Sequence, residues 1–364
     1  MKKKKKVRLA GTTTNTTPVF LVKMFEPRKG KGKVVVRKLE LEATQSLLNS
    51  WVACRMKCKY MLQGWEPVAQ KASFRFGNLI HKILEMLYKR MMVKKPTVSE
   101  LENSLDTLVS KEMKAASLRR ASPGDIESER LEILKANALM HEYINVWKGD
   151  LKKDWIEVEK VFNVQFGDKW HLKGKRDRAF KKGKEIWIQE DKTSSRISEE
   201  ELDLRLSFDA QSLFYNVAKR LEIIEEGGNP DAVKGVMYNI VRVPGQRWKQ
   251  VKKDVNGKKL KTPRLESDKE LLERIRQEIK EEPEHYFFRY EVGFPTEAVF
   301  EYTEELKAKL HEFKLWLEGK LATYKNESHC TGRYRCEFLP VCASGGKSFD
   351  GFSKSRVLFR ELEE

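Results

Sequence analysis

The chain has 364 residues, of which 40% are hydrophobic and 35% are charged, a composition typical of a soluble globular protein with a substantial core. No apolar run approaches the roughly 20 residues that a membrane helix needs, so we expect no membrane-spanning segment. The 72 Lys and Arg residues against 54 Asp and Glu residues give a formal net charge of +18 at pH 7. This charge favours a polyanionic partner, with nucleic acid ahead of an anionic membrane surface.

The two ends of the chain are predicted to lie outside the folded domain. Residues 1–17 begin with a run of lysines but have no apolar stretch behind it, which indicates a disordered basic tail and no secretory signal. We therefore expect an intracellular protein, either cytoplasmic or associated with the nucleoid. Residues 18–345 are predicted to form a single domain, followed by a C-terminal tail at 346–364.

The first half of the domain is predicted to be mostly helical. After a segment at 31–46 that could form an edge hairpin, residues 44–62 have helical spacing and a capping residue at Thr44 or Ser46. A second amphipathic helix covers 76–92 and places His81 beside its apolar stripe. Residues 96–150 predict a helical insertion that the sequence SPGD interrupts.

Alternating apolar residues begin at Trp155 and predict strands at 155–167, 170–180 and 185–192, joined by the turns FGDK and KKGK. Such short connections are typical of an antiparallel meander. A helix at 207–224 and a strand at 233–243 follow. This order predicts an α/β or α+β fold with a central mixed sheet flanked by helices.

A basic segment follows the last of these strands. Residues 242–264 hold nine Lys and Arg residues and a single acid, Asp254, with glycine and proline between them, which indicates a mobile basic loop. Trp248 could stack on a base, and a solvated hairpin is the alternative interpretation. The residues predicted to contact nucleic acid are Arg247, Trp248, Lys249, Lys252 and Lys253. Helices are expected from 265 to 325.

Acidic residues within the predicted meander suggest a cation site. In an extended strand Glu190 and Lys192 share one face while Asp191 points to the other, and Asp177 comes from the preceding strand. Two carboxylates beside an ammonium group can hold a hard divalent cation for phosphodiester hydrolysis. Acid-x-Lys triplets also arise by chance in a chain so rich in both, so an isolated EDK sequence predicts only a surface ion pair.

Four short motifs that follow one another along the chain favour the cation site over a surface ion pair. The chain has GNLIH in a predicted helix, GKRD and EDKT in successive strands, and QSLFY in the next helix. Together they resemble the PD-(D/E)XK nucleases, and among them the RecB-like branch that includes CRISPR-associated exonucleases and phage recombination proteins. The resemblance implies a restriction-endonuclease-like core and a Mg²⁺ or Mn²⁺ cofactor.

The same resemblance assigns roles to individual residues. The metal ligands that it implies are His81, Asp177, Glu190 and the backbone carbonyl of Asp191. It makes Lys192 the catalytic lysine, and Gln211 and Tyr215 line the active site from one helix face. A slip of one residue in strand register would exchange Asp191 with Glu190.

The five cysteines suggest a second site. Cys330, Cys336 and Cys342 follow each other at equal gaps, and with the distant Cys54 they could form a four-thiolate site that ties together the two ends of the domain. The RecB-like branch often has a [4Fe-4S] cluster there, although its first two cysteines are commonly closer in sequence. Zinc and free buried thiols are the alternatives, and Cys58 could replace Cys54.

The motifs predict a metal-dependent deoxyribonuclease that works on single strands or DNA ends in recombination, repair or replication. Two alternatives remain open from the sequence. The first is a DNA-binding or scaffold protein that keeps the fold and the cluster without catalysis. The second is a structure-selective or nicking endonuclease. Two carboxylates in a site for a polyanion argue against the first, because they repel phosphate unless a cation intervenes.

Overall fold

The computed structural model describes residues 41–68, 72–118, 122–194, 206–253, 258–332, 335–355 and 362. The predicted basic tail and most of the predicted edge hairpin lie outside these residues. The described end of the hairpin segment is strand β1 (Leu41–Ala43), which pairs in parallel with β4 (Trp170–Lys182). No helix in the described ranges combines the length and the apolar character needed to cross a membrane.

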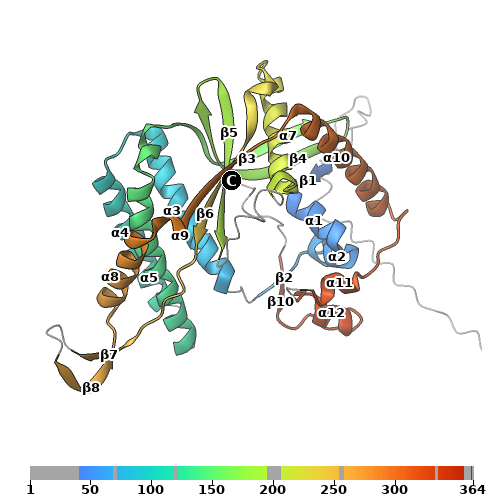
Figure 1. Cartoon of the computed structure of the whole chain (residues 1–364). Helices are drawn as coiled ribbons and strands as arrows, with labels where there is room; N and C mark the ends of the chain where they lie inside the picture. Colours follow the sequence, from blue (N-terminus) through green and yellow to red (C-terminus); the bar gives the residue numbers. More distant parts are fainter. Residues whose placement is uncertain are drawn as a thin grey trace, which may run out of the picture.

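A mixed sheet of six strands forms the centre of the molecule, as predicted (Figure 1). β4 pairs with antiparallel neighbours on both sides, β3 (Asp154–Phe166) and β5 (Glu185–Ser194), so the predicted meander is confirmed. β6 (Val233–Arg242) continues the sheet in parallel with β5, and α7 (Ala210–Glu225) connects the two. The last strand is β9 (Phe287–Gly293), antiparallel to β6.

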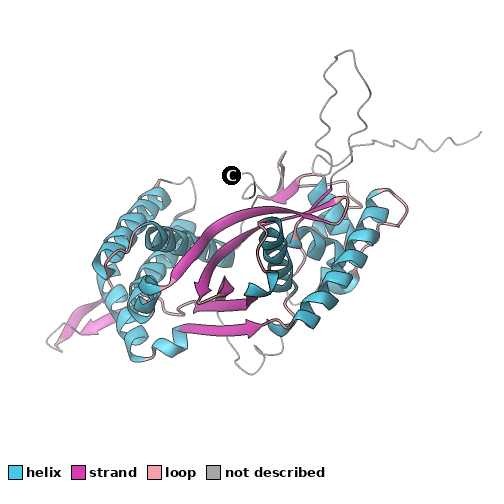
Figure 2. Cartoon of the chain, turned by 90° about the horizontal axis from the view of Figure 1, so that it is seen from above, coloured by secondary structure: helices cyan, strands magenta, loops and turns pink. Residues whose placement is uncertain are grey.

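Helices cover both faces of this sheet (Figure 2). The first core lies between the sheet and helices that include α1 (Gln45–Ala53), α7 and α10 (Thr296–Leu317). The second core lies on the opposite face. Its helices are α3 (Ala72–Val93), α4 (Val98–Ser117), α5 (Pro123–Val146) and α8 (Asp268–Glu281). The sheet is therefore buried on both faces, which explains the long apolar stretches in β5 and β6.

The predicted helical insertion consists of α4 and α5. Thr97 begins α4 with a capping box, in which its hydroxyl accepts from the Glu100 N–H and the Glu100 carboxylate accepts from the Thr97 N–H. The SPGD sequence ends the connection and starts the next helix, since Ser122 caps α5 and Pro123 occupies its first position. Proline is favoured there because that N–H has no partner within a helix.

Strands β5 and β6 show the expected alternation between the two cores. Ile188 faces the first core and Trp187 faces the second. β3 departs from this rule, because Val158 faces the second core and Phe162 the first although both are even-numbered. Between them, Glu159 has a φ of 50°. A residue in this left-handed region interrupts the pleat, so the facing of the strand reverses at Glu159.

Three predicted elements differ in the structure. Residues 242–264 are not an open loop, because β7 (Gln250–Lys253) and β8 (Lys259–Leu265) form an antiparallel hairpin that projects from the helical side (Figure 1). The region expected to be helical from 265 to 325 contains strand β9 between α9 (Pro283–Tyr286) and α10. From Phe288 to Val292 the sequence alternates apolar and polar residues, a strand pattern that the expectation of continuous helix passed over, and this segment pairs with β6.

The helix predicted at 44–62 is also divided, into α1 and α2 (Arg55–Leu62), with extended backbone at Cys54. Neither glycine nor proline marks this break. The C-terminal region supplies partners for the free helix ends, because the Asn326 side-chain amide donates to the Ala53 carbonyl (2.8 Å) and the Met56 N–H donates to the Tyr324 carbonyl (3.2 Å). A tertiary contact from a residue 273 positions along the chain therefore ends α1, which local sequence could not reveal.

The end of the described chain packs against these N-terminal helices (Figure 1). α11 (Glu327–Cys330) and α12 (Leu339–Ala343) carry Cys330 and Cys342, and Cys336 lies between the two helices. After them, β10 (Phe352–Lys354) pairs with β2 (Trp65–Pro67). The segment expected to be a tail from 346 onward therefore contributes at least one strand to the fold.

Candidate active site

Glu190, Lys192 and Gln211 form a closed hydrogen-bonded triangle between β5 and α7. The Lys192 ammonium donates to Glu190 Oε1 (2.8 Å) and to Gln211 Oε1 (2.9 Å). The Gln211 amide in turn donates to Glu190 Oε1 (2.7 Å) and to the Tyr215 hydroxyl (3.3 Å). Three of the predicted residues thus fix one another's side chains, and Tyr215 supports the amide from one helical turn further on.

Asp177 and His81 lie on the other side of Glu190. The Asp177 carboxylate accepts from the Asp191 backbone N–H (2.7 Å), which joins β4 to β5 at the point where their regular pairing has ended. Its second oxygen lies 3.5 Å from His81 Nδ1 on α3. Residues from α3, β4, β5 and α7 therefore meet in one place, in the arrangement that the four motifs predict.

The glycines of two motifs permit this convergence. At Gly77, one turn before His81, a Cβ atom would lie 3.2 Å from the Thr193 hydroxyl at the end of β5. At Gly174, a Cβ atom would lie 2.6 Å from the Phe162 ring, which packs edge-on against Tyr215. A larger residue would push α3 away from β5 at the first position and displace the Phe162 ring at the second.

Burial shapes the charges of the site. Burial raises the pKa of Glu190 to about 7, and the nearby Asp177 carboxylate adds to this effect while Lys192 opposes it. Burial disfavours the charged form of Asp177 too, yet its contact with His81 keeps its pKa below the usual value. The same contact outweighs burial at the imidazole and raises the pKa of His81 to about 9. Keeping the two buried carboxylates charged therefore costs free energy, and a cation bound between them would reduce that cost.

One carboxylate oxygen fits such a cation. Glu190 Oε2 is buried and has no hydrogen-bond partner among the described residues. Buried carboxylate oxygens are normally paired, so an unpaired one in a carboxylate that interacts electrostatically with Asp177 and His81 is a suitable ligand atom. Glu190 is not in the group of described residues whose ligand atoms lie within 4.8 Å of one another, so an ion shared with Asp177 and His81 would draw its carboxylate closer to them. Carboxylate oxygens with an imidazole nitrogen suit Mg²⁺ or Mn²⁺ better than a soft metal.

The Asp191 side chain faces away from this site, as the alternation of β5 predicts. Its Oδ1 accepts from the Asn239 amide (2.7 Å) and, at short distance, from Arg178. The Arg178 guanidinium is fully buried over the Tyr88 ring of α3. A buried ion pair therefore holds Asp191 on the second-core side, and its backbone carbonyl remains the predicted ligand.

Glu159 is a residue of this region that the motifs do not include. It lies on β3, and its carboxylate oxygen, an Asp177 oxygen and a His81 nitrogen all lie within 4.8 Å of one another. The hairpin register was the signal that could have found it, because Phe166 pairs with Trp170 and counting back from this pair places Glu159 opposite Asp177.

The four predicted cluster ligands come together near the two ends of the domain. The Cys342 thiol is close enough to Cys330 and Cys54 for all three to interact electrostatically, and the Cys336 N–H donates to the Cys330 carbonyl (3.2 Å). Burial raises the pKa of Cys58, and the nearby Cys54 thiol adds to this effect.

The spacing of these thiols bears on which metal they could hold. Among the described residues, no three cysteine sulfurs lie within 4.8 Å of one another. A single tetrahedral zinc, with Zn–S bonds of about 2.3 Å, would require the sulfurs to lie closer together than this.

The residues predicted to contact nucleic acid lie on and before the β7–β8 hairpin. Arg247, Lys249, Lys252 and Lys253 are exposed. Trp248 is half-buried against the second core, which limits its ring as a stacking surface. The hairpin thus presents cations to solvent beyond the helical side of the molecule (Figure 1).

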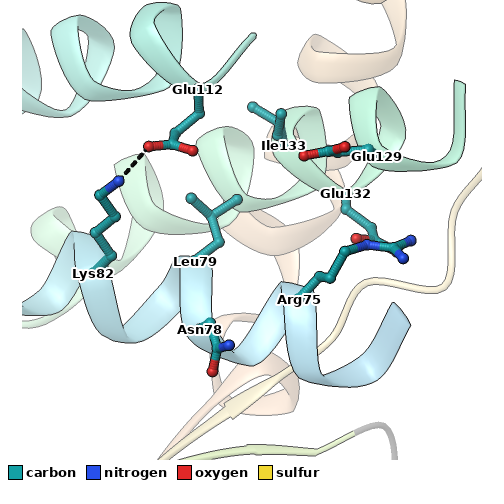
Figure 3. Close-up of a pocket in the computed structure, with 8 residues that line it drawn as sticks. All are labelled: Arg75, Asn78, Leu79, Lys82, Glu112, Glu129, Glu132 and Ile133. Carbon is teal, nitrogen blue, oxygen red and sulfur yellow. Dashed lines mark hydrogen bonds and ion pairs between the residues drawn. The ribbon is translucent and has the colours of Figure 1, made fainter. Parts of the chain in front are cut away.

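A cavity of about 190 Å³ lies between α3, α4 and α5 (Figure 3). Its two cations are already paired, Lys82 with Glu112 (2.5 Å) and Arg75 with Glu132 (3.4 Å). None of the residues predicted for catalysis or metal binding lines it. The cavity is therefore separate from the candidate active site.

Comparison with known proteins agrees with this geometry. A family model described as the PD-(D/E)XK nuclease superfamily matches residues 42–343, which include every motif residue discussed above. A search of curated proteins found no match. The match covers most of the chain, and the chain therefore belongs to the PD-(D/E)XK nuclease superfamily.

Proposed function

We propose that this protein is a divalent-metal-dependent deoxyribonuclease of the RecB-like exonuclease type, which acts on DNA ends or single strands. The observation that carries the proposal is the convergence of His81, Asp177, Glu190 and Lys192, with Glu190 Oε2 buried and unpaired. A merely structural ion pair between Glu190 and Lys192 would not require a second carboxylate and an imidazole at the same place.

His81, Asp177, Glu190 and the Asp191 backbone carbonyl are the proposed ligands of Mg²⁺ or Mn²⁺. When bound, such an ion polarises a phosphoryl oxygen and lowers the pKa of a coordinated water. The Asp191 side chain, held by Arg178 and Asn239, keeps the backbone of β5 in place so that the carbonyl can serve as a ligand.

Lys192 is the proposed catalytic lysine, acting as a cation. Burial alone would lower its pKa, but the adjacent Glu190 carboxylate raises it above the usual value, so the ammonium stays protonated. A protonated lysine cannot act as a general base. It can orient the attacking water and stabilise the negative charge that develops on the phosphate.

Gln211 and Tyr215 are proposed to position this lysine. The Gln211 amide is oriented by its two donor contacts, to Glu190 and to the Tyr215 hydroxyl, so that its carbonyl oxygen faces Lys192. Burial raises the pKa of Tyr215, so its hydroxyl remains protonated. The exposed cations of the β7–β8 hairpin are proposed to contact the DNA backbone.

The experiment that tests the function uses end-labelled linear DNA and circular single-stranded DNA with Mg²⁺, Mn²⁺ or EDTA. We expect metal-dependent release of short products from linear DNA and resistance of the circle. Cutting of the circle at a similar rate would instead show an endonuclease. Binding of DNA without cleavage under all conditions would contradict a nuclease and favour the non-catalytic alternative.

We also propose that Cys54, Cys330, Cys336 and Cys342 hold a [4Fe-4S] cluster with a structural role. Their convergence from both ends of the domain supports this, since a shared cluster would tie α2 to α11 and α12. The expected result is a coloured protein with bound iron and a broad visible absorption that Cys336→Ser removes. Cys58→Ser, which changes a thiol outside the set, should retain both signals. A colourless, iron-free protein prepared without oxygen would contradict the cluster.

A further inference from the structure

Glu159 occupies a place at the candidate active site that no sequence motif explains. In the register of β3 and β4 it lies opposite Asp177, on the strand that precedes the predicted carboxylate. Its carboxylate, the Asp177 carboxylate and the His81 ring each offer an atom within 4.8 Å of the other two. Ligands about 2.1 Å from an octahedral ion lie roughly 3 Å apart when adjacent and 4.2 Å when opposite, so this spacing suits one ion after small adjustments.

The backbone of β3 brings this side chain to Asp177 at a conformational cost. Glu159 is the sole non-glycine residue with a positive φ in the described part of the chain. An L residue with a Cβ is disfavoured in that region, so the surrounding structure must impose the conformation. The reversal of facing that it causes takes Glu159 out of both cores and towards α3.

The Glu159 carboxylate is paired with a lysine ammonium, which can take the place of a bound metal ion. Lys175 Nζ lies 2.7 Å from the Glu159 carboxylate. Burial, followed by repulsion from Asp177, raises the pKa of Glu159 in spite of this lysine. The unpaired Glu190 Oε2, in a side chain that is 5% exposed, is an independent observation that points to a cation in this region.

We propose that Glu159 is a ligand for a divalent cation together with His81 and Asp177, so that the ion site extends onto β3. The inference rests on the proposed function and adds a residue to that site. Lys175 then competes with the cation for the Glu159 carboxylate, because its ammonium already occupies one side of that carboxylate.

The test is Mn²⁺ binding to the full chain without DNA, measured by calorimetry and by electron paramagnetic resonance of free Mn²⁺. We expect Glu159→Gln to weaken Mn²⁺ binding by about tenfold or more. Lys175→Met should strengthen binding in the wild-type background and have no effect in the Glu159→Gln background. Glu291→Gln is the matched control, since it removes the same charge from an exposed ion pair with Lys182 (3.2 Å) on β9. It should bind Mn²⁺ as the wild type does.

An unchanged Mn²⁺ affinity in Glu159→Gln, in a protein whose thermal unfolding matches the wild type, would overturn the inference. An equal effect of Lys175→Met in both backgrounds would also overturn it, because the lysine would then act through general electrostatics. These outcomes are independent of the cleavage assay. A protein that cuts DNA but binds Mn²⁺ without Glu159 keeps the proposed function, and one that needs Glu159 for Mn²⁺ but never cuts keeps the inference.

Discussion

Lys192→Ala is expected to reduce metal-dependent DNA cleavage by about 10²- to 10³-fold, the loss seen when one charge-stabilising donor is removed from an active site. The Lys192 ammonium donates to Glu190 and Gln211 and stays protonated. No other described cation makes these contacts, so none can replace it. Because Lys192 is not a proposed metal ligand, Mn²⁺ binding should persist. Single-turnover cleavage and Mn²⁺ titration of the same preparation measure the two properties.

Lys182→Ala is the matched control for this substitution. Lys182 also ends a strand of the central sheet, but its ammonium is exposed and its ion pair with Glu291 is 3.2 Å long at the surface. Losing the same unit of charge there should change the cleavage rate less than about twofold. If Lys192→Ala cleaved DNA as fast as Lys182→Ala does, Lys192 would have no catalytic role.

Glu157→Gln is expected to lower the free energy of unfolding by about 1–3 kcal/mol, because it removes the main carboxylate partner of two buried cations, which keep only their contacts with Glu222. Glu157 accepts from Arg176 Nε (2.9 Å) and from Lys219 Nζ (2.5 Å). All three side chains are buried between the sheet and α7. Chemical denaturation measures the loss, and Glu291→Gln, which removes a carboxylate from an exposed pair, should cost about 0–1 kcal/mol.

The effect of Glu157→Gln should depend on pH with a definite sign. Burial disfavours the charged carboxylate, but Arg176 and Lys219 outweigh it and lower the pKa of Glu157 to about 2. A lowered pKa in the folded state contributes stability above the unfolded value of roughly 4.3, and this stability is lost as the pH falls towards 2. The difference between wild type and variant should be constant from pH 6 to 8 and shrink below pH 4. A difference that grows on acidification would contradict this assignment.

The sequence predicted how the motif side chains lie relative to one another because each motif residue belongs to a regular element. Alternation along β5 placed Glu190 and Lys192 on one face and Asp191 on the other, and helical spacing placed Gln211 below Tyr215. These relations depend on local geometry alone. Only the motif order linked the four elements, and the roles of their residues remain proposals.

The residues that the sequence missed depend on departures from regular geometry or on distant contacts. Glu159 lies near Asp177 because the β3 backbone adopts a left-handed conformation that no glycine announces. The break at Cys54 depends on Asn326 and Tyr324, far along the chain. Periodicity contains no information on either of these causes. β9 is different, because its alternating apolar and polar residues did carry a strand pattern, and β6 offers it an edge.

The most direct measurement is anomalous X-ray diffraction from crystals of the wild-type protein soaked in Mn²⁺. The proposed metal site predicts a strong anomalous peak within coordination distance of Asp177. The peak should lie next to His81 and the Glu190 carboxylate and close to the Lys192 ammonium. Full Mn²⁺ occupancy elsewhere on the molecule, with no peak beside Asp177, would contradict the account.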